Sequence, residues 1–131
     1  SVEPIYGLAA IGLVHPQHVR KNAEARAGDV LILSKGLGVG VMSAAFKKNA
    51  LPDAAYQAMI QSTTQLNTPG VALGQWVGVH AMTGVTGFGL LGHAWEIARG
   101  SALTIELKQD QLPWLPHVQD LAAQGYITGA S

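Results

Sequence analysis

The feature with the clearest chemical meaning is a glycine-rich stretch at residues 83–93, which reads Thr-Gly-Val-Thr-Gly-Phe-Gly-Leu-Leu-Gly-His. Apolar residues recur in and after it at spacings of three and four, which predicts a helix that begins near Thr86. We expect Thr86 to be the N-cap and the N–H groups of Gly87, Phe88 and Gly89 to lack side-chain partners. A helix start with free N–H groups and a positive dipole end suits an anion such as phosphate.

The glycines have a second explanation, which their spacing leaves open. Glycine inside a helix costs about 1 kcal/mol relative to alanine, so Gly89 and Gly92 need a compensating role. Either another part of the backbone packs closely against them or a ligand does. Only the second explanation gives the stretch a chemical function.

The helix that follows is expected to bury one face. Residues at helical spacing predict that face: Phe88, Leu91, Trp95 and Ala98. His93 and Glu96 are three residues apart on the polar face, where an exposed pair contributes only about 0.2–0.5 kcal/mol. On physical grounds we expect this pair to be unimportant.

Residues 83–93 resemble the signature Thr-Asp-Val-Thr-Gly-Phe-Gly-Leu-Leu-Gly-His of the selenophosphate synthetase (selenide, water dikinase) family and differ from it at one position. Residues 3–9 resemble the family's Glu-Pro-Ile-Tyr-Gly-Leu-Ala, and residues 33–40 resemble its Leu-Thr-Lys-Pro-Leu-Gly-hydrophobic-Gly. The resemblance runs nearly end to end. It implies the architecture of ATP-using enzymes related to aminoimidazole ribonucleotide synthetase, of which this chain would be a fragment.

The resemblance also implies a reaction, in which ATP, selenide and water give selenophosphate, AMP and phosphate. The implied nucleophile, catalytic lysine and most metal-binding aspartates lie in a part of the family that this chain lacks. We therefore expect no catalytic residue here and an isolated chain that is inactive.

The single mismatch in the signature falls on Gly84. The family has an aspartate at this position, and it is implied to help hold magnesium against the ATP phosphates. Glycine offers no side-chain oxygen. We therefore expect ATP to be the family's nucleotide but expect no metal ligand at this position.

Residues 34–40, Ser-Lys-Gly-Leu-Gly-Val-Gly, contain a further candidate phosphate contact. They do not form a dinucleotide fingerprint, because its third glycine would fall on Val41, and no Gly-Lys-Ser/Thr of a Walker loop follows. Lys35 could reach a phosphate, although a surface lysine beside a hinge is the more common case. The predicted phosphate and nucleotide site therefore comprises Lys35, Thr86, Gly87, Phe88 and Gly89.

The order of patterns predicts an α/β fold of the α+β type, with a mixed sheet and packed helices. Strands are expected at residues 5–14, 30–33, 79–85 and 103–107. Helices are expected at residues 39–48, 53–67, 71–77, 86–99 and 117–124. The resemblance implies a partial two-domain architecture: residues 1–36 would end the ATP-binding domain, and residues 37–131 would begin the C-terminal domain.

Composition excludes several classes of protein. The net charge is zero, so no basic stripe for nucleic acid exists, and the absence of cysteine excludes disulfides and thiolate zinc sites. Residues 54–95 carry no Asp, Glu, Lys or Arg, but Asn67, Pro69 and frequent glycines argue against a membrane helix. No signal-peptide pattern opens the sequence, so we expect a cytoplasmic protein.

We expect a homodimer or larger assembly in which residues 5–14 and 30–34 pair or pack across chains, because an apolar strand with open edges attracts another chain. The resemblance also implies dimerisation through strands of the N-terminal domain. Two alternatives remain. One is a non-catalytic assembly fragment or degenerate homologue that acts through protein association. The other is a superfamily member with another substrate, as in hydrogenase maturation or purine synthesis, against which residues 88–93 argue.

Overall fold

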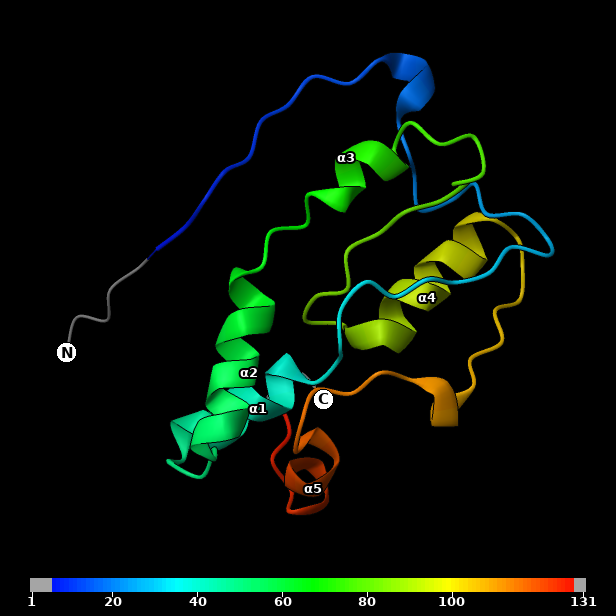
Figure 1. Cartoon of the computed structure of the whole chain (residues 1–131). Coiled ribbons are helices and arrows are strands. Elements are labelled where there is room, and N and C mark those ends of the chain that lie inside the picture. Colours follow the sequence, from blue (N-terminus) through cyan, green and yellow to red (C-terminus); the bar gives the residue numbers. More distant parts are fainter. Residues whose placement is uncertain (1–5, 129–131) are drawn as a thin grey trace.

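The computed structural model describes residues 6–128 and shows short helices joined by long extended connections (Figure 1). The helical elements in chain order are η1 (Pro16–His18), α1 (Val39–Lys47), α2 (Asp53–Thr64), α3 (Pro69–Leu73), α4 (Gly89–Gly100), η2 (Gln109–Gln111) and α5 (Val118–Ala123). Within residues 6–128 no strand forms, and the only bridge between extended segments is the isolated parallel one of Leu37 and Trp114.

The predicted α/β fold with a mixed sheet is therefore wrong. Residues 6–14, 30–33 and 103–107 have no strand partner among the described residues, and Ile5 lies outside them. Segment 79–85 makes one long-range backbone contact, from the Met82 N–H to the Lys21 carbonyl at 3.1 Å. Alternating or continuous apolar residues show that a segment suits a pleated surface, but a strand also needs a neighbouring backbone. The described residues supply no such neighbour.

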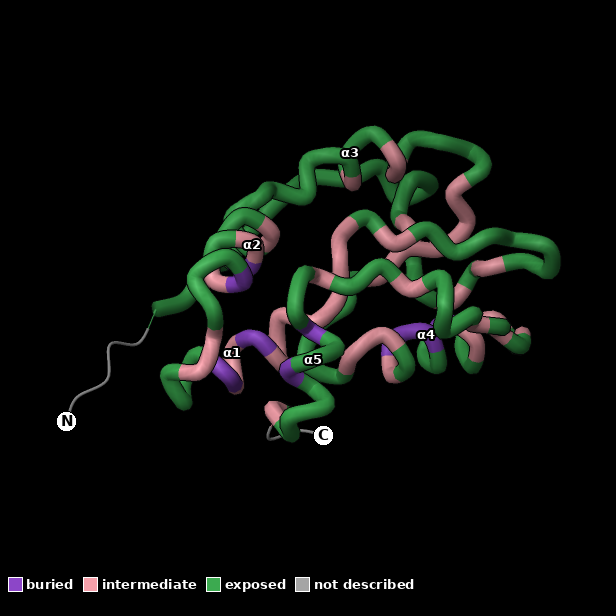
Figure 2. Tube along the Cα trace, turned by 60° about the horizontal axis from the view of Figure 1, so that its bottom comes forward, coloured by how far each residue is buried: buried purple, intermediate pink, exposed green. Residues whose placement is uncertain are grey.

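The hydrophobic core lies where α1 meets α2 and α5, as the purple segments of Figure 2 show. Its buried members are Met42, Ala45, Ala55, Met59, Val118 and Leu121. Small alanines let the helices approach closely, and the flexible methionines fill the space that remains. Gly38, just before α1, has φ +116°, and a Cβ there would overlap the Val118 side chain. Glycine at this position therefore allows α1 and α5 to pack.

The predicted helices match the structure better than the predicted strands do. α1, α4 and α5 begin and end within three residues of their predicted limits. α2 begins at the predicted residue and ends at Thr64, three residues before its predicted limit, and α3 begins at Pro69, two residues before the predicted start at residue 71. Proline is well suited to the first turn of a helix because its missing N–H needs no partner there.

α4 is held at its C-terminal end by the connection at residues 22–25. The Ala25 N–H donates to the Ser101 hydroxyl at 3.0 Å, and a Cβ on Gly100 would lie 2.8 Å from the Cβ of Ala23. Gly100 is thus a packing glycine. None of the helices in the described part of the chain is long and apolar enough to cross a membrane.

Candidate phosphate-binding site

The glycine-rich stretch leads into α4, and no side chain caps the start of that helix. The N-cap is Phe88, with φ −78° and ψ −2°, and not Thr86 as predicted. A turn precedes it, in which the Gly89 N–H donates to the Thr86 carbonyl at 2.9 Å. Within the described residues the N–H groups of Gly87 and Phe88 have no hydrogen-bond partner. Of the three N–H groups predicted to be free, those of Gly87 and Phe88 have no partner in the described residues, whereas that of Gly89 is bonded to Thr86, and the N-cap is a different residue.

The two explanations for the glycines apply to different positions. A Cβ on Gly84, Gly87 or Gly89 would meet no atom within 4 Å, so close packing does not account for these three residues. A Cβ on Gly92 would lie 3.0 Å from the Cβ of Phe88, so this glycine serves packing. Gly89 also has φ +68°, a conformation that glycine adopts at little cost. The backbone around residues 84–89 is open to a ligand.

Thr86 does not cap the helix because its hydroxyl is bonded to His93. The Thr86 Oγ1 lies 3.0 Å from the His93 Nε2, and the His93 Nδ1 lies 3.3 Å from a carboxylate oxygen of Glu96. His93 is only 8% exposed. The prediction that His93 and Glu96 form an exposed, unimportant pair is wrong for His93.

The buried face of α4 also differs from the predicted one. Phe88, Leu91 and Trp95 are 80%, 75% and 59% exposed. The buried residues of the helix are instead His93, Ala94 and Ile97. An apolar stripe is buried only where another element packs on it, and in the described residues none covers this stripe.

Lys35 is engaged elsewhere in the structure. Its Nζ donates to the Ser62 carbonyl at 3.0 Å and to the Gln65 carbonyl at the C-terminal end of α2. A cation is favourable there because the last carbonyls of a helix carry partial negative charge. Lys35 lines a small pocket with residues of α2 and with Leu115 and Pro116, and none of Thr86, Gly87, Phe88 or Gly89 lines it. The structure does not bring Lys35 together with them.

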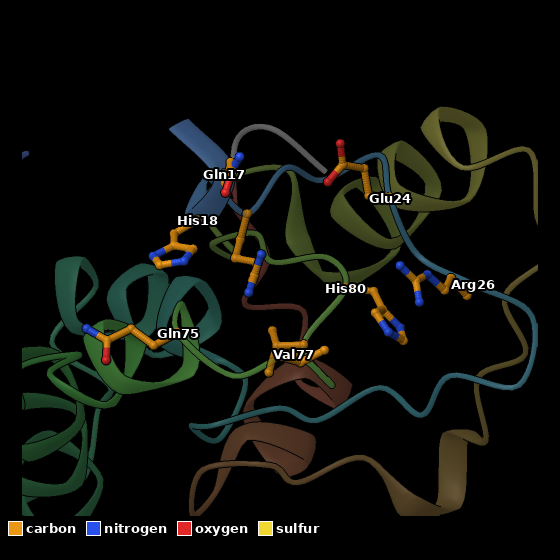
Figure 3. Close-up of a pocket in the computed structure, with 9 residues that line it drawn as sticks. Gln17, His18, Glu24, Arg26, Gln75, Val77 and His80 are labelled. Carbon is orange, nitrogen blue, oxygen red and sulfur yellow. The ribbon is translucent and has the colours of Figure 1, made fainter. Parts of the chain in front are cut away.

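A larger pocket, of about 620 Å³, lies between residues 17–26 and residues 75–80. Figure 3 shows Gln17 and His18 on one side of it and Arg26 and His80 on the other. The His80 Nδ1 lies 2.9 and 3.0 Å from the two carboxylate oxygens of Asp29. Sequence reasoning missed this pair because its members are far apart in the sequence and share no motif.

The pKa of the Asp29 carboxyl is lowered by its hydrogen bonds. The hydrogen bond from the Arg26 N–H, at 2.8 Å, holds the pKa of the Asp29 carboxyl below its ordinary value, and the contact with His80 acts in the same direction. A lowered carboxyl pKa stabilises the fold above the ordinary pKa, and that contribution is lost as the pH falls through the lowered one. The pair joins the turn at residues 26–29 to the segment that leads into the glycine-rich stretch.

Comparison with known families shows which domain contains this site. Residues 26–127 match the family described as AIR synthase related protein, C-terminal domain. The chain belongs to this family. The match covers the glycine-rich stretch, α4 and the core helices, so the open backbone at residues 84–89 is part of an AIR synthase related C-terminal domain.

Three relatives that match the whole chain carry the same name. The chain is 61% identical over 131 residues to a "Selenide, water dikinase" of Burkholderia pseudomallei (strain K96243) and 60% identical to one of Pseudomonas straminea. It is 58% identical to a "Selenide, water dikinase" of Rhizobium meliloti (strain 1021). All of this chain is covered in each case, but it spans only 37–38% of the length of these relatives.

The glycine-rich stretch at residues 83–93 carries no carboxylate that could bind a magnesium ion. No group of three or more His, Cys, Asp or Glu side chains that could hold a metal occurs among residues 6–128. Gly84 contributes no side-chain oxygen, and Mg²⁺ is bound in proteins mainly through carboxylates. The open N–H groups of Gly87 and Phe88, in contrast, fit the oxygens of a phosphate.

Proposed function

We propose that the chain is part of a selenide, water dikinase, which makes selenophosphate, AMP and phosphate from ATP, selenide and water. The observation that carries the proposal is identity of about 60% across all 131 residues with proteins of that name. The whole reaction would belong to the complete protein, and the cytoplasm, where ATP is available, is the compartment that we propose for it.

Within that enzyme, the proposed task of residues 86–89 is to hold phosphate oxygens of ATP. The open space around Gly87 and Gly89, the unpaired N–H groups and the positive end of α4 support this role. Lys35 is the second proposed phosphate contact. Its long side chain would have to exchange the carbonyls of Ser62 and Gln65 for the ligand.

Titration of the chain with a non-hydrolysable ATP analogue tests this site. Gly87→Leu places a side chain in open space before the free N–H groups, and we expect it to weaken binding at least about tenfold, as loss of hydrogen bonds to a charged group does. Gly78→Leu is the matched control, because a Cβ there also meets nothing within 4 Å. Lys35→Met, in the same titration, measures whether Lys35 contributes. Equal affinities of Gly87→Leu and the wild type would contradict the proposed site.

We also propose the domain division at residue 36, with residues 37–131 forming the first part of the C-terminal domain. Every buried apolar residue in the described chain lies after this point, from Met42 onwards. Residues 6–36 contribute none of them. The buried apolar core of the described chain therefore lies entirely in the part after residue 36, which is what supports the division.

A second candidate function, protein association, is favoured by the exposed apolar arm, which we define as residues 6–14. Figure 1 shows the arm extending away from the helices. Its large apolar side chains are almost fully exposed, with Leu8, Ile11 and Leu13 at 86%, 97% and 105%. A contiguous apolar surface of this kind is typical of an interaction site. We propose that a second copy of the chain covers it, in a homodimer or larger assembly.

Light scattering at micromolar concentration checks this proposal, and we expect at least the mass of a dimer. The double variant Ile11→Lys, Leu13→Lys is expected to be monomeric, because two ammonium groups would otherwise be buried between the chains. Val77→Lys, which replaces an apolar side chain that is 90% exposed outside the arm, is expected to remain dimeric. A wild-type chain with the mass of a monomer would overturn the proposed assembly.

A further inference from the structure

His93 is a buried histidine with a specific partner at each ring nitrogen. Its Nε2 lies 3.0 Å from the Thr86 hydroxyl and its Nδ1 lies 3.3 Å from the Glu96 carboxylate. The Phe88 ring lies against it, with centroids 6.0 Å apart. Thr86 itself is exposed at the open backbone. The imidazole therefore links Thr86, just before α4, to the carboxylate of Glu96, three residues after His93 in the same helix.

The chemistry of these groups decides which atom carries each hydrogen. An ionised carboxylate only accepts hydrogen bonds, so the His93 Nδ1 donates to Glu96. In the neutral imidazole the Nε2 then has only a lone pair, and the Thr86 hydroxyl must donate to it. In the imidazolium form the Nε2 donates instead, and the Thr86 oxygen accepts.

The neutral and the protonated forms of His93 leave different sides of the Thr86 hydroxyl facing the open backbone at residues 84–89: lone pairs in the first case and the hydrogen in the second. With neutral His93, the outward side of the Thr86 oxygen offers lone pairs, which repel a phosphate oxygen. With protonated His93, the hydroxyl hydrogen is free to point outward beside the N–H groups of Gly87 and Phe88. Histidine is the side chain that changes charge between about pH 5 and 8.

We infer that His93 is a positioning residue that sets the direction of the Thr86 hydroxyl, and so decides whether Thr86 donates to a bound anion. The phosphate part of this inference rests on the proposed function. The charged group that faces His93 is Glu96, from the same helix. Thr86 and Phe88, which contact His93 from the preceding segment, are uncharged, and Arg99 stacks on Trp95, 4.8 Å from the ring centroid.

Nitrogen NMR of the imidazole tests the hydrogen-bond direction without any ligand. In the ligand-free chain, we expect the neutral imidazole of His93 to be the tautomer with hydrogen on Nδ1. Thr86→Val is expected to shift the Nε2 resonance, and Glu96→Gln to increase the share of the other tautomer. Hydrogen on Nε2 in the wild type, or an Nε2 resonance indifferent to Thr86→Val, would overturn the inference whatever the ligand does.

The pH dependence of binding tests the consequence, with a non-hydrolysable ATP analogue as the probe. As the pH is lowered until the imidazole NMR shows His93 to be protonated, wild-type affinity is expected to rise about tenfold more than that of Thr86→Val, the effect of one hydrogen bond to a charged group. Ionisation of the ATP analogue changes the affinity of every variant in the same way, so it cancels when the wild type is compared with Thr86→Val. Thr86→Ser keeps the hydroxyl, so it is expected to keep the wild-type pH profile. Glu106→Gln removes an exposed carboxylate outside the site, and it is also expected to keep that profile.

The outcomes separate the inference from the proposed function. If the wild type binds and Thr86→Val has the same pH profile, the inference is wrong and the phosphate site survives. If the wild type does not bind at any pH, the phosphate site is wrong, and the NMR result alone decides the direction of the Thr86 hydroxyl. His93→Gln, if it folds, is expected to behave as Thr86→Val does in the titration.

Discussion

The isolated chain is expected to release no AMP above the rate without protein when it is supplied with ATP, selenide and magnesium. It spans only 37% of the length of the Burkholderia pseudomallei relative named selenide, water dikinase. Residues 6–128 contain no metal-binding cluster, and the chain has no cysteine that could serve as a nucleophile. The described chain offers the unpaired N–H groups of Gly87 and Phe88, which we propose hold phosphate and which could not activate water or selenide.

Chromatographic measurement of AMP, with the full-length relative as the positive control, checks this expectation. Folding of the isolated chain is established first by circular dichroism, since a loss of the helices would also abolish activity. AMP release by the folded chain at a rate near that of the relative would show that the catalytic groups lie within these 131 residues.

Gly84→Asp is expected to restore magnesium-dependent nucleotide binding in a protein that supplies the remaining ligands. We would replace the corresponding segment of the Burkholderia pseudomallei relative with this chain, to which that segment is 61% identical. A carboxylate fits at position 84, because a Cβ there meets nothing within 4 Å and the backbone is not left-handed. In the presence of magnesium, affinity for an ATP analogue should rise at least about tenfold, the lower end of the change typical of altering groups around a metal.

The measurement is a titration with and without magnesium, and Gly78→Asp is its matched control. Gly78 is also in open space, so this variant adds the same charge away from the phosphates. A chimera whose magnesium dependence is the same with and without Gly84→Asp would mean that residue 84 does not contact the metal.

The helices of this chain could be predicted from the sequence because their hydrogen bonds are local. Periodicity identified α1, α4 and α5, whose backbone groups pair within each segment. Residues 6–14 and 103–107 have patterns typical of strands, but a strand is completed by a partner that the pattern does not specify. The predicted sheet was therefore wrong although the apolar patterns themselves are real.

The candidate site could be located from the sequence, but its contacts could not. The spacing of the glycines near residue 87 allowed either close packing or a ligand, and only the structure shows open space around them. The partner of Thr86 is His93, seven residues later, and that contact depends on which face of α4 is buried. The sequence suggested the opposite face, because an apolar stripe does not reveal whether anything packs on it. Asp29 and His80, 51 residues apart, share no local signal at all.

The most direct test of the account is selenide-dependent AMP release by the chimera that carries Gly84→Asp. If this chain is the corresponding part of a selenide, water dikinase, the chimera should release AMP at a rate within about tenfold of the parent enzyme, a difference of about 1.4 kcal/mol in activation free energy. Adding Gly87→Leu should abolish most of that rate, and adding Gly78→Leu should not. A folded chimera that binds ATP but releases no AMP in response to selenide would contradict the assignment.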